Sequence, residues 1–131
     1  EITLFSSIGY NKTTFTEFID GNNNYSDNYN PNAPKYNFNI GVQYRNELGY
    51  YARADINGYG KTYFDSANNY SQKAYELVDT KIGYETNDYD IYLYANNLFD
   101  KEHHATNAYF VGTTTIYREG REVGVKLAYR F

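Results

Sequence analysis

The chain has 131 residues and a net charge of −4, with 12 lysine and arginine side chains against 16 aspartate and glutamate, so it lacks the basic footprint that nucleic-acid binding needs. The absence of cysteine excludes a disulfide framework, a thiolate metal site and a cysteine nucleophile, and no apolar run reaches the roughly 20 residues of a membrane-spanning helix. Tyrosine (18 residues) and phenylalanine (8) are abundant although the mean hydropathy is −0.78, which is unlike a soluble domain with an aliphatic core.

The N-terminal segment, residues 1–18, reads EITLFSSIGYNKTTFTEF and is expected to form a long strand. Its facing stays open, because Ile2, Leu4 and Ile8 favour one side of an extended chain whereas Phe5 and Phe15 favour the other. The polar stretch 20–34 then predicts a long loop.

The next two strands form the most legible pair. Apolar and polar residues alternate through 36–45, and a second alternating run begins at residue 50. The tight connection 46–49 makes this pair a hairpin.

Two more strands and a final strand follow. A medium connection, 65–73, leads to a strand with Val78, Thr80 and Ile82 on one face, and the tight connection 86–88 leads to a strand with Ile91 and Leu93. After a long connection at 101–114 the chain ends on REVGVKLAYRF, in which apolar residues again alternate with polar ones. The expected fold is all-β, an antiparallel meander of about six long strands.

Long and short connections alternate, which places long loops at one end of the sheet and tight turns at the other, as in outer-membrane β-barrels. Aromatic residues gather near both ends, as membrane interfaces favour: Tyr44, Tyr50, Tyr84, Tyr89, Tyr129 and Phe131 beside the tight turns, and Phe15, Phe18, Tyr36, Tyr75, Phe99 and Tyr117 beside the long loops. The alternative is an antiparallel sheet of a soluble protein whose apolar face covers a core.

Three stretches resemble TonB-dependent outer-membrane receptors. The segment YLYANNLFDKEHHA, 92–105, resembles the penultimate strand of that family running into Asn-Leu-Phe-Asp-Lys, and REGREVGVKLAYRF, 118–131, resembles its last strand. The segment NAPKYNFNIGVQY, 32–44, is similar to the re-entry of a surface loop into the barrel. The resemblance covers nearly the whole chain and implies that residues 1–131 are the C-terminal segment of a barrel of about 22 strands.

The resemblance also implies partners and a location. The complete receptor would lie in the outer membrane of a Gram-negative bacterium and import an iron-siderophore or similar scarce nutrient, with a plug domain in its barrel and energy from the TonB complex. Six strands fall short of the smallest closed barrel, about eight. The segment therefore either belongs to a larger barrel or associates with copies of itself through its strand edges.

In the family, the last strand is the recognition tag for the barrel-assembly machinery. On this chain the resemblance assigns that signal to Val125, Leu127, Tyr129 and Phe131. The same residues are expected to face membrane lipid. Such a strand can lend its backbone edge to another sheet by β-augmentation.

Charged residues within the strands are expected to face the interior, because Arg or Lys facing the centre of the bilayer costs about 2–4 kcal/mol. Mutual pairing and contact with a plug are the expected roles of these lumen-facing residues: Arg45, Arg53, Asp55, Asp79 and Lys81.

Candidates for ligand contact lie near the last long connection. His103 and His104 could touch a haem or metal chelate, although adjacent residues of an extended chain point apart and loop histidines are usually just solvated. Tyr109 and Phe110 could cover an aromatic ligand, or serve in the aromatic band.

No catalytic constellation, phosphate loop or zinc spacing is present, so the sequence predicts neither an enzyme nor a resident metal or cofactor. Two rival functions remain: a small structural or adhesive outer-membrane barrel without transport, and a soluble β-sheet binding module.

Overall fold

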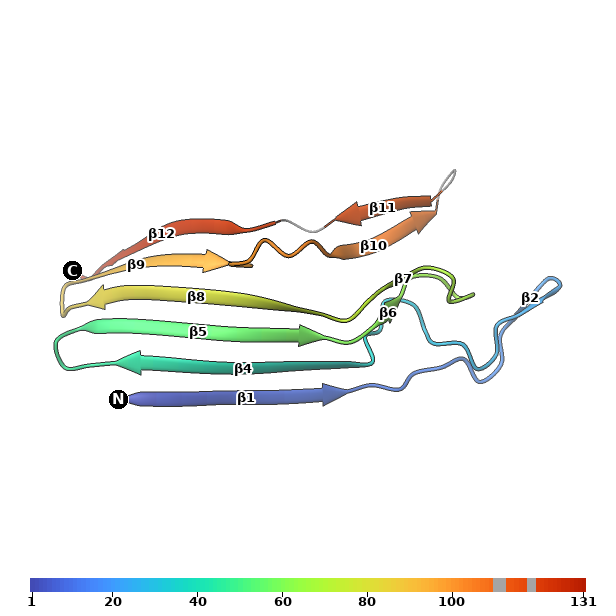
Figure 1. Ribbon diagram of the computed structural model, residues 1–131, viewed down its shortest axis with the longest axis horizontal. Coiled ribbons are helices and arrows are strands. Elements are labelled where there is room, and N and C mark those ends of the chain that lie inside the picture. The colour runs from blue at the N-terminus through green and yellow to red at the C-terminus, as the bar shows by residue number, and fades with distance from the viewer. Residues whose placement is uncertain (110–112, 118–119) are drawn as a thin grey trace.

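The computed structural model describes residues 1–109, 113–117 and 120–131, with side chains described for 1–103 and 120–131. Its centre is one antiparallel sheet of six strands in the order β1-β4-β5-β8-β9-β12 (Figure 1). The expected all-β meander of about six strands is therefore confirmed. Among the described residues, no helix is long and apolar enough to cross a bilayer. The six strands are β1 (Ile2–Tyr10), β4 (Tyr36–Arg45), β5 (Tyr50–Tyr59), β8 (Tyr75–Glu85), β9 (Tyr89–Asn96) and β12 (Glu122–Tyr129).

Connections of unequal length separate the two ends of this sheet, as expected. Tight turns join β4 to β5 and β8 to β9 at one end, where both chain termini also lie, and the three long connections extend from the other (Figure 1). The long connections contain short strand pairs of their own: β2 (Ile19–Asp20) with β3 (Asn23–Asn24), β6 (Thr62–Tyr63) with β7 (Ser71–Gln72), and β10 (His104–Tyr109) with β11 (Thr113–Tyr117).

Two boundaries differ from the expectation. The first strand ends at Tyr10 and not near residue 18, because the last bond toward β4 runs from Asn11 N to Lys35 O and the chain then turns into the first long loop. The connection expected at 101–114 carries a strand pair, β10 with β11, whose pairing lies outside the six-stranded sheet.

The register divides the side chains into two faces. On one face, Ile2, Tyr44, Ala52, Ile82, Leu93 and Val125 form a single row across all six strands. This apolar face is open: Ile82 is 56% exposed and Leu127 71%. The facing of the first strand is now settled, since Ile2, Leu4 and Ile8 share this face.

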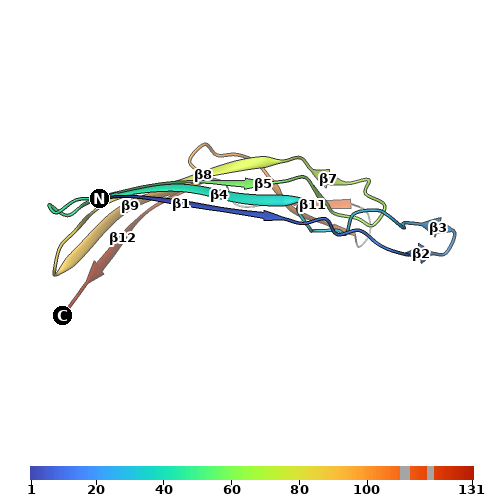
Figure 2. The same ribbon diagram turned by 90° about the horizontal axis from the view of Figure 1, so that it is seen from below.

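The opposite face, which we call the polar face, carries the row Thr3, Gln43, Arg53, Lys81, Tyr94 and Gly124. Two of its aromatic residues are buried: Tyr51 is 6% exposed and Tyr92 9%. Figure 2 shows that the sheet is arched and not flat. The usual arrangement of a soluble sheet is thus inverted, with the aliphatic side chains outside and the polar ones in contact with each other.

Candidate functional site on the polar face

A ladder of polar side chains crosses the middle of the polar face. Arg53 makes a bidentate ion pair with Asp55, two residues away on β5, at 2.6 and 2.8 Å. Asn39 donates to Asn57 at 2.9 Å, and Asn57 donates to Asp79 at 2.9 Å. These bonds tie β4, β5 and β8 together through their side chains, in addition to the backbone ladder.

Lys81, beside this ladder, is held by aromatic rings. Its ammonium lies 3.8 Å from the ring centre of Tyr92 and 5.4 Å from that of Tyr51. The two rings meet edge to face, with centroids 5.4 Å apart, and Gly83 stands between them in the register. A β-carbon on Gly83 would overlap the Tyr92 ring, so the glycine is what allows the two rings to meet.

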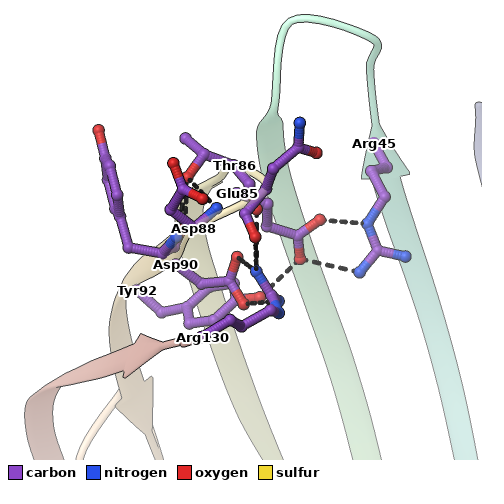
Figure 3. Close-up of polar contacts among 9 residues, drawn as sticks. Arg45, Glu85, Thr86, Asp88, Asp90, Tyr92 and Arg130 are labelled. Carbon is purple, nitrogen blue, oxygen red and sulfur yellow. Dashed lines mark hydrogen bonds and ion pairs between the residues drawn. The ribbon is translucent and has the colours of Figure 1, made fainter.

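A second polar cluster, which we call the turn-end network, lies beside the tight turns (Figure 3). Arg45 at the end of β4 makes two bonds to Glu85 at the end of β8, at 2.6 and 2.9 Å. The hydroxyl of Tyr92 donates to the same carboxylate at 2.6 Å. Figure 3 shows Arg45 from β4 and Tyr92 from β9 converging on Glu85 of β8.

Arg130 extends the turn-end network to the last strand. Its guanidinium bonds both carboxylate oxygens of Asp90, at 3.2 and 2.5 Å, and donates to the backbone oxygen of Thr86 at 2.9 Å (Figure 3). The side chain of Asp90 is 8% exposed. Arg130 thus closes the β8–β9 turn against the end of β12.

All five residues expected to face the interior lie on the polar face: Arg45, Arg53, Asp55, Asp79 and Lys81. The structure pairs Arg53 with Asp55, pairs Arg45 with Glu85, and bonds Asp79 to amide groups instead of a cation. Sequence reasoning did not single out Glu85, Asp90 or Arg130. Their positions could have identified them. Each lies one or two residues from a tight turn or from the chain end, and the alternation of its strand places it on the polar face.

Of the expected ligand-contact residues, His103 is the one whose side chain the structure describes. His103 is 5% exposed and its ring stacks on Tyr75 at 4.8 Å. The Tyr75 ring stacks in turn on that of Tyr59, with centroids 5.1 Å apart. The register places both residues on the polar face. Tyr75 is therefore not one of the membrane-interface aromatic residues, contrary to the expectation from the sequence. His104 and Tyr109 lie in β10 without described side chains, and Phe110 lies outside the described residues. Ligand contact by these four residues stays a prediction.

The residues expected to form the assembly signal lie on β12 and just beyond it. Val125, Leu127 and Tyr129 share the apolar face, each more than 60% exposed, and Phe131 is fully exposed. The rings of Tyr129 and Phe131 meet edge to face with centroids 5.5 Å apart. β12 is an edge strand of the sheet, so one side of its backbone is open to further pairing.

The polar face offers charged and polar groups for binding. A hollow of about 340 Å³ lies over its centre, lined by residues that include Arg53, Asp79, Lys81, Tyr94 and Lys126. Within the described part of the chain, no three histidine or acidic side chains are grouped closely enough to hold a metal ion. Opposite charges around one hollow suit contact with a polar solute or a polar protein surface.

The comparisons with known proteins point in one direction. The family described as TonB dependent receptor-like, beta-barrel, matches residues 1–98. The crystal structure of the ferric yersiniabactin uptake receptor FyuA from Yersinia pestis is similar over 79% of this chain and 17% of that protein, at 27% identity and a TM-score of 0.71.

Two further receptors share the fold. The siderophore receptor PiuA from Acinetobacter baumannii matches 96% of this chain and 19% of its own length, at 21% identity and a TM-score of 0.78. The ferric-catecholate import receptor Fiu from E. coli matches 96% of this chain and 18% of its own, at 19% identity and a TM-score of 0.68. The chain therefore spans about a fifth of the length of the receptors that it matches.

Proposed function

This chain belongs to the TonB-dependent receptor-like β-barrel family, and from that premise we propose that it forms the C-terminal barrel segment of an outer-membrane receptor that binds and imports an iron-siderophore or a similar scarce nutrient. The family is one of receptors and not of enzymes. The segment contributes wall to a larger barrel whose remaining strands would pair with the open edges of β1 and β12.

One observation carries this proposal: the apolar face is open while the polar face is internally bonded. Aliphatic side chains as exposed as Leu127 (71%) are costly in water but favourable against lipid tails. A soluble protein would need a second layer over that face. A lipid bilayer supplies the equivalent cover. The proposed location of the segment is therefore the outer membrane.

The polar face then faces the barrel interior. Its partly exposed cations and carboxylates, among them Arg45, Arg53 and Lys81, are available for a plug domain or for a passing solute. The iron chelate would enter from the long-loop end. The TonB complex would act from the tight-turn end, through the plug domain of the complete receptor.

The last strand has the form of an assembly tag. Phe131 is fully exposed beside an open backbone edge, so both an aromatic anchor and unpaired amide groups are available to a partner sheet. The barrel-assembly machinery is the proposed partner of Val125, Leu127, Tyr129 and Phe131. Self-association through the same edge is expected when the segment is produced alone.

Uptake of radioactive iron tests the import function. The complete receptor is expressed in a host that lacks its own siderophore receptors, and a panel of ferric siderophores labelled with ⁵⁵Fe is supplied. We expect uptake of at least one chelate, abolished in a host without TonB. Uptake that persists without TonB, or its absence for every chelate despite a folded receptor in the outer membrane, would support a barrel without energised transport.

A further inference from the structure

Three lysines occupy paired positions on three neighbouring chain segments at the long-loop end. Lys35 N donates to Lys61 O at 3.4 Å, which continues the register of β4 with β5. The pairs Tyr59 with Tyr75 and Thr62 with Gln72 share one register, which places Lys61 opposite Lys73. We call Lys35, Lys61 and Lys73 the lysine row. Like charges on opposing positions destabilise a sheet, so this row costs stability unless something compensates it.

The ammonium groups of two of these lysines converge on stacked tyrosine rings. Tyr29 and Tyr63 are nearly parallel, with centroids 5.7 Å apart. Lys35 Nζ lies 3.9 Å from the centre of Tyr29 and 5.9 Å from that of Tyr63, and Lys61 Nζ lies 4.3 Å from Tyr63. Lys61 also donates to the Tyr63 hydroxyl at 3.0 Å, and this bond lowers the pKa of Tyr63 below its ordinary value.

Among the described residues, no carboxylate forms an ion pair with the lysine row. The three ion pairs among the described residues are Arg45 with Glu85, Arg53 with Asp55 and Arg130 with Asp90. On the same face, two rows of uncharged residues separate the lysines from Asp55 and Asp79. At about 3.4 Å per residue this is roughly 20 Å along the strand. The separation exceeds the Debye length of about 8 Å at physiological salt.

The loops that carry the cluster are fixed to each other. The amide of Asn68 both donates to Tyr29 O and accepts from Tyr29 N, at 2.8 Å each. Asn32 N donates to Tyr63 O at 2.7 Å. The first long loop is therefore bonded to the β5–β8 connection, and the cations are held in place without a ligand, which lowers the entropic cost of binding.

A stack of aromatic rings lies one register row from the lysines, toward the middle of the sheet. Tyr59, Tyr75 and His103 stack face to face there, with successive centroids 5.1 and 4.8 Å apart. The long-loop end of the polar face thus combines three lysines that make no described ion pair with flat aromatic surface, at the place where a solute would enter the barrel.

We propose that the lysine row is an anion-binding site for a small solute with at least two negatively charged oxygen groups, carboxylate or phosphate, at the entrance to the interior. The proposal rests on the proposed function in taking the polar face as the interior of the barrel. The ammonium groups supply charge-assisted hydrogen bonds to the oxyanions, and the bound solute relieves the repulsion within the row.

Equilibrium dialysis of the complete receptor in detergent tests the site, with radiolabelled citrate and pyrophosphate as probes. Lys35→Gln/Lys61→Gln is expected to weaken the binding of at least one probe tenfold or more, and Lys35→Arg/Lys61→Arg to retain most of it. The matched control is Lys12→Gln/Lys101→Gln, which makes the same change of charge at the same end, outside the row. Heat-modifiable migration in SDS gels verifies folding.

Several outcomes would overturn the inference. They are an absence of citrate and pyrophosphate binding, binding unaffected by rising salt, or an equal loss in the Lys12/Lys101 control. Should the glutamine pair fail to fold, Lys73→Gln and the single variants carry the same expectation at a smaller size. Iron uptake without lysine-dependent anion binding would refute this site but leave the receptor function standing. Lysine-dependent anion binding without any iron uptake would support this site but refute the import function.

Discussion

Arg130 and Asp90 form a bidentate ion pair that joins the end of the last strand to the strand before it, with Nη2 to Oδ2 at 2.5 Å and Nη1 to Oδ1 at 3.2 Å. The same guanidinium also binds the β8–β9 turn through Thr86 O. One side chain therefore ties the residue that follows β12 both to β9 and to the β8–β9 turn, next to Phe131.

Removing this pair should loosen the end of β12. We expect Arg130→Gln to destabilise the receptor by about 1–3 kcal/mol, because the largely buried carboxylate of Asp90 loses its described partner, although the exposure of Arg130 moderates the cost. Urea-induced unfolding in lipid vesicles measures the difference. Lys126→Gln, a loss of one cation on the same face of β12, should have little effect. Equal stabilities of Arg130→Gln and Lys126→Gln would contradict this role.

Gly83 should be intolerant of a side chain. The β-carbon of an alanine there would overlap both the Tyr92 ring and the backbone oxygen of Ile91, and we expect a loss of about 1–3 kcal/mol from overpacking. Gly9→Ala is the control, since its β-carbon would meet only the end of the Asn37 side chain, which can rotate away. The midpoint of unfolding in urea compares the two variants. A smaller loss for Gly83→Ala than for Gly9→Ala would show that the ring contact is not what fixes this position.

Asn68 should control the docking of two long loops. We predict that Asn68→Gly increases cleavage within residues 11–35 by protease added to intact cells, because both amide bonds to Tyr29 are lost. Glycine is chosen because Asn68 has a φ of 58°, which glycine adopts without strain. Asn69→Gly is the matched control, since the described bond of Asn69 comes from its backbone. Cleavage that does not change in Asn68→Gly would mean that other contacts hold the loops.

Much of the fold was readable in the sequence. The alternation in 36–45, 50–57 and 121–131 gave the correct faces, because a sheet with one apolar and one polar face requires strict period-2 patterning. The loop asymmetry also followed from the spacing of polar clusters alone.

The sequence did not predict the features that depend on the register between strands. The first strand could not be oriented from its own residues, and the answer lies on β5, where the guanidinium of Arg53 sits 4.8 Å from the ring centre of Phe5. The pairing of Arg130 with Asp90 and of Arg45 with Glu85 joins residues 40 positions apart. Tyr75 was assigned to the aromatic residues at the long-loop end because of its position along the strand. Its face is set by the alternation of side chains on β8, which puts it on the polar face.

A charge should be tolerated on one face and not on the other. We expect Leu93→Lys to cost about 2–4 kcal/mol in a bilayer, whereas Tyr94→Lys, its neighbour on β9, should cost clearly less because its side chain lies on the polar face. Refolding into lipid vesicles at graded urea concentrations measures both. The same cost for the two lysines would contradict the assignment of the faces.

Depth-resolved quenching tests the central claim most directly. Single cysteines at Lys81, Ile82, Lys126 and Leu127 of the complete receptor, unique within this cysteine-free segment, are labelled with an environment-sensitive fluorophore and placed in vesicles of brominated lipid. The account predicts strong quenching at 82 and 127 and weak quenching at 81 and 126, since only the apolar face touches lipid tails. Equal quenching at all four positions, or the reverse order, would contradict it.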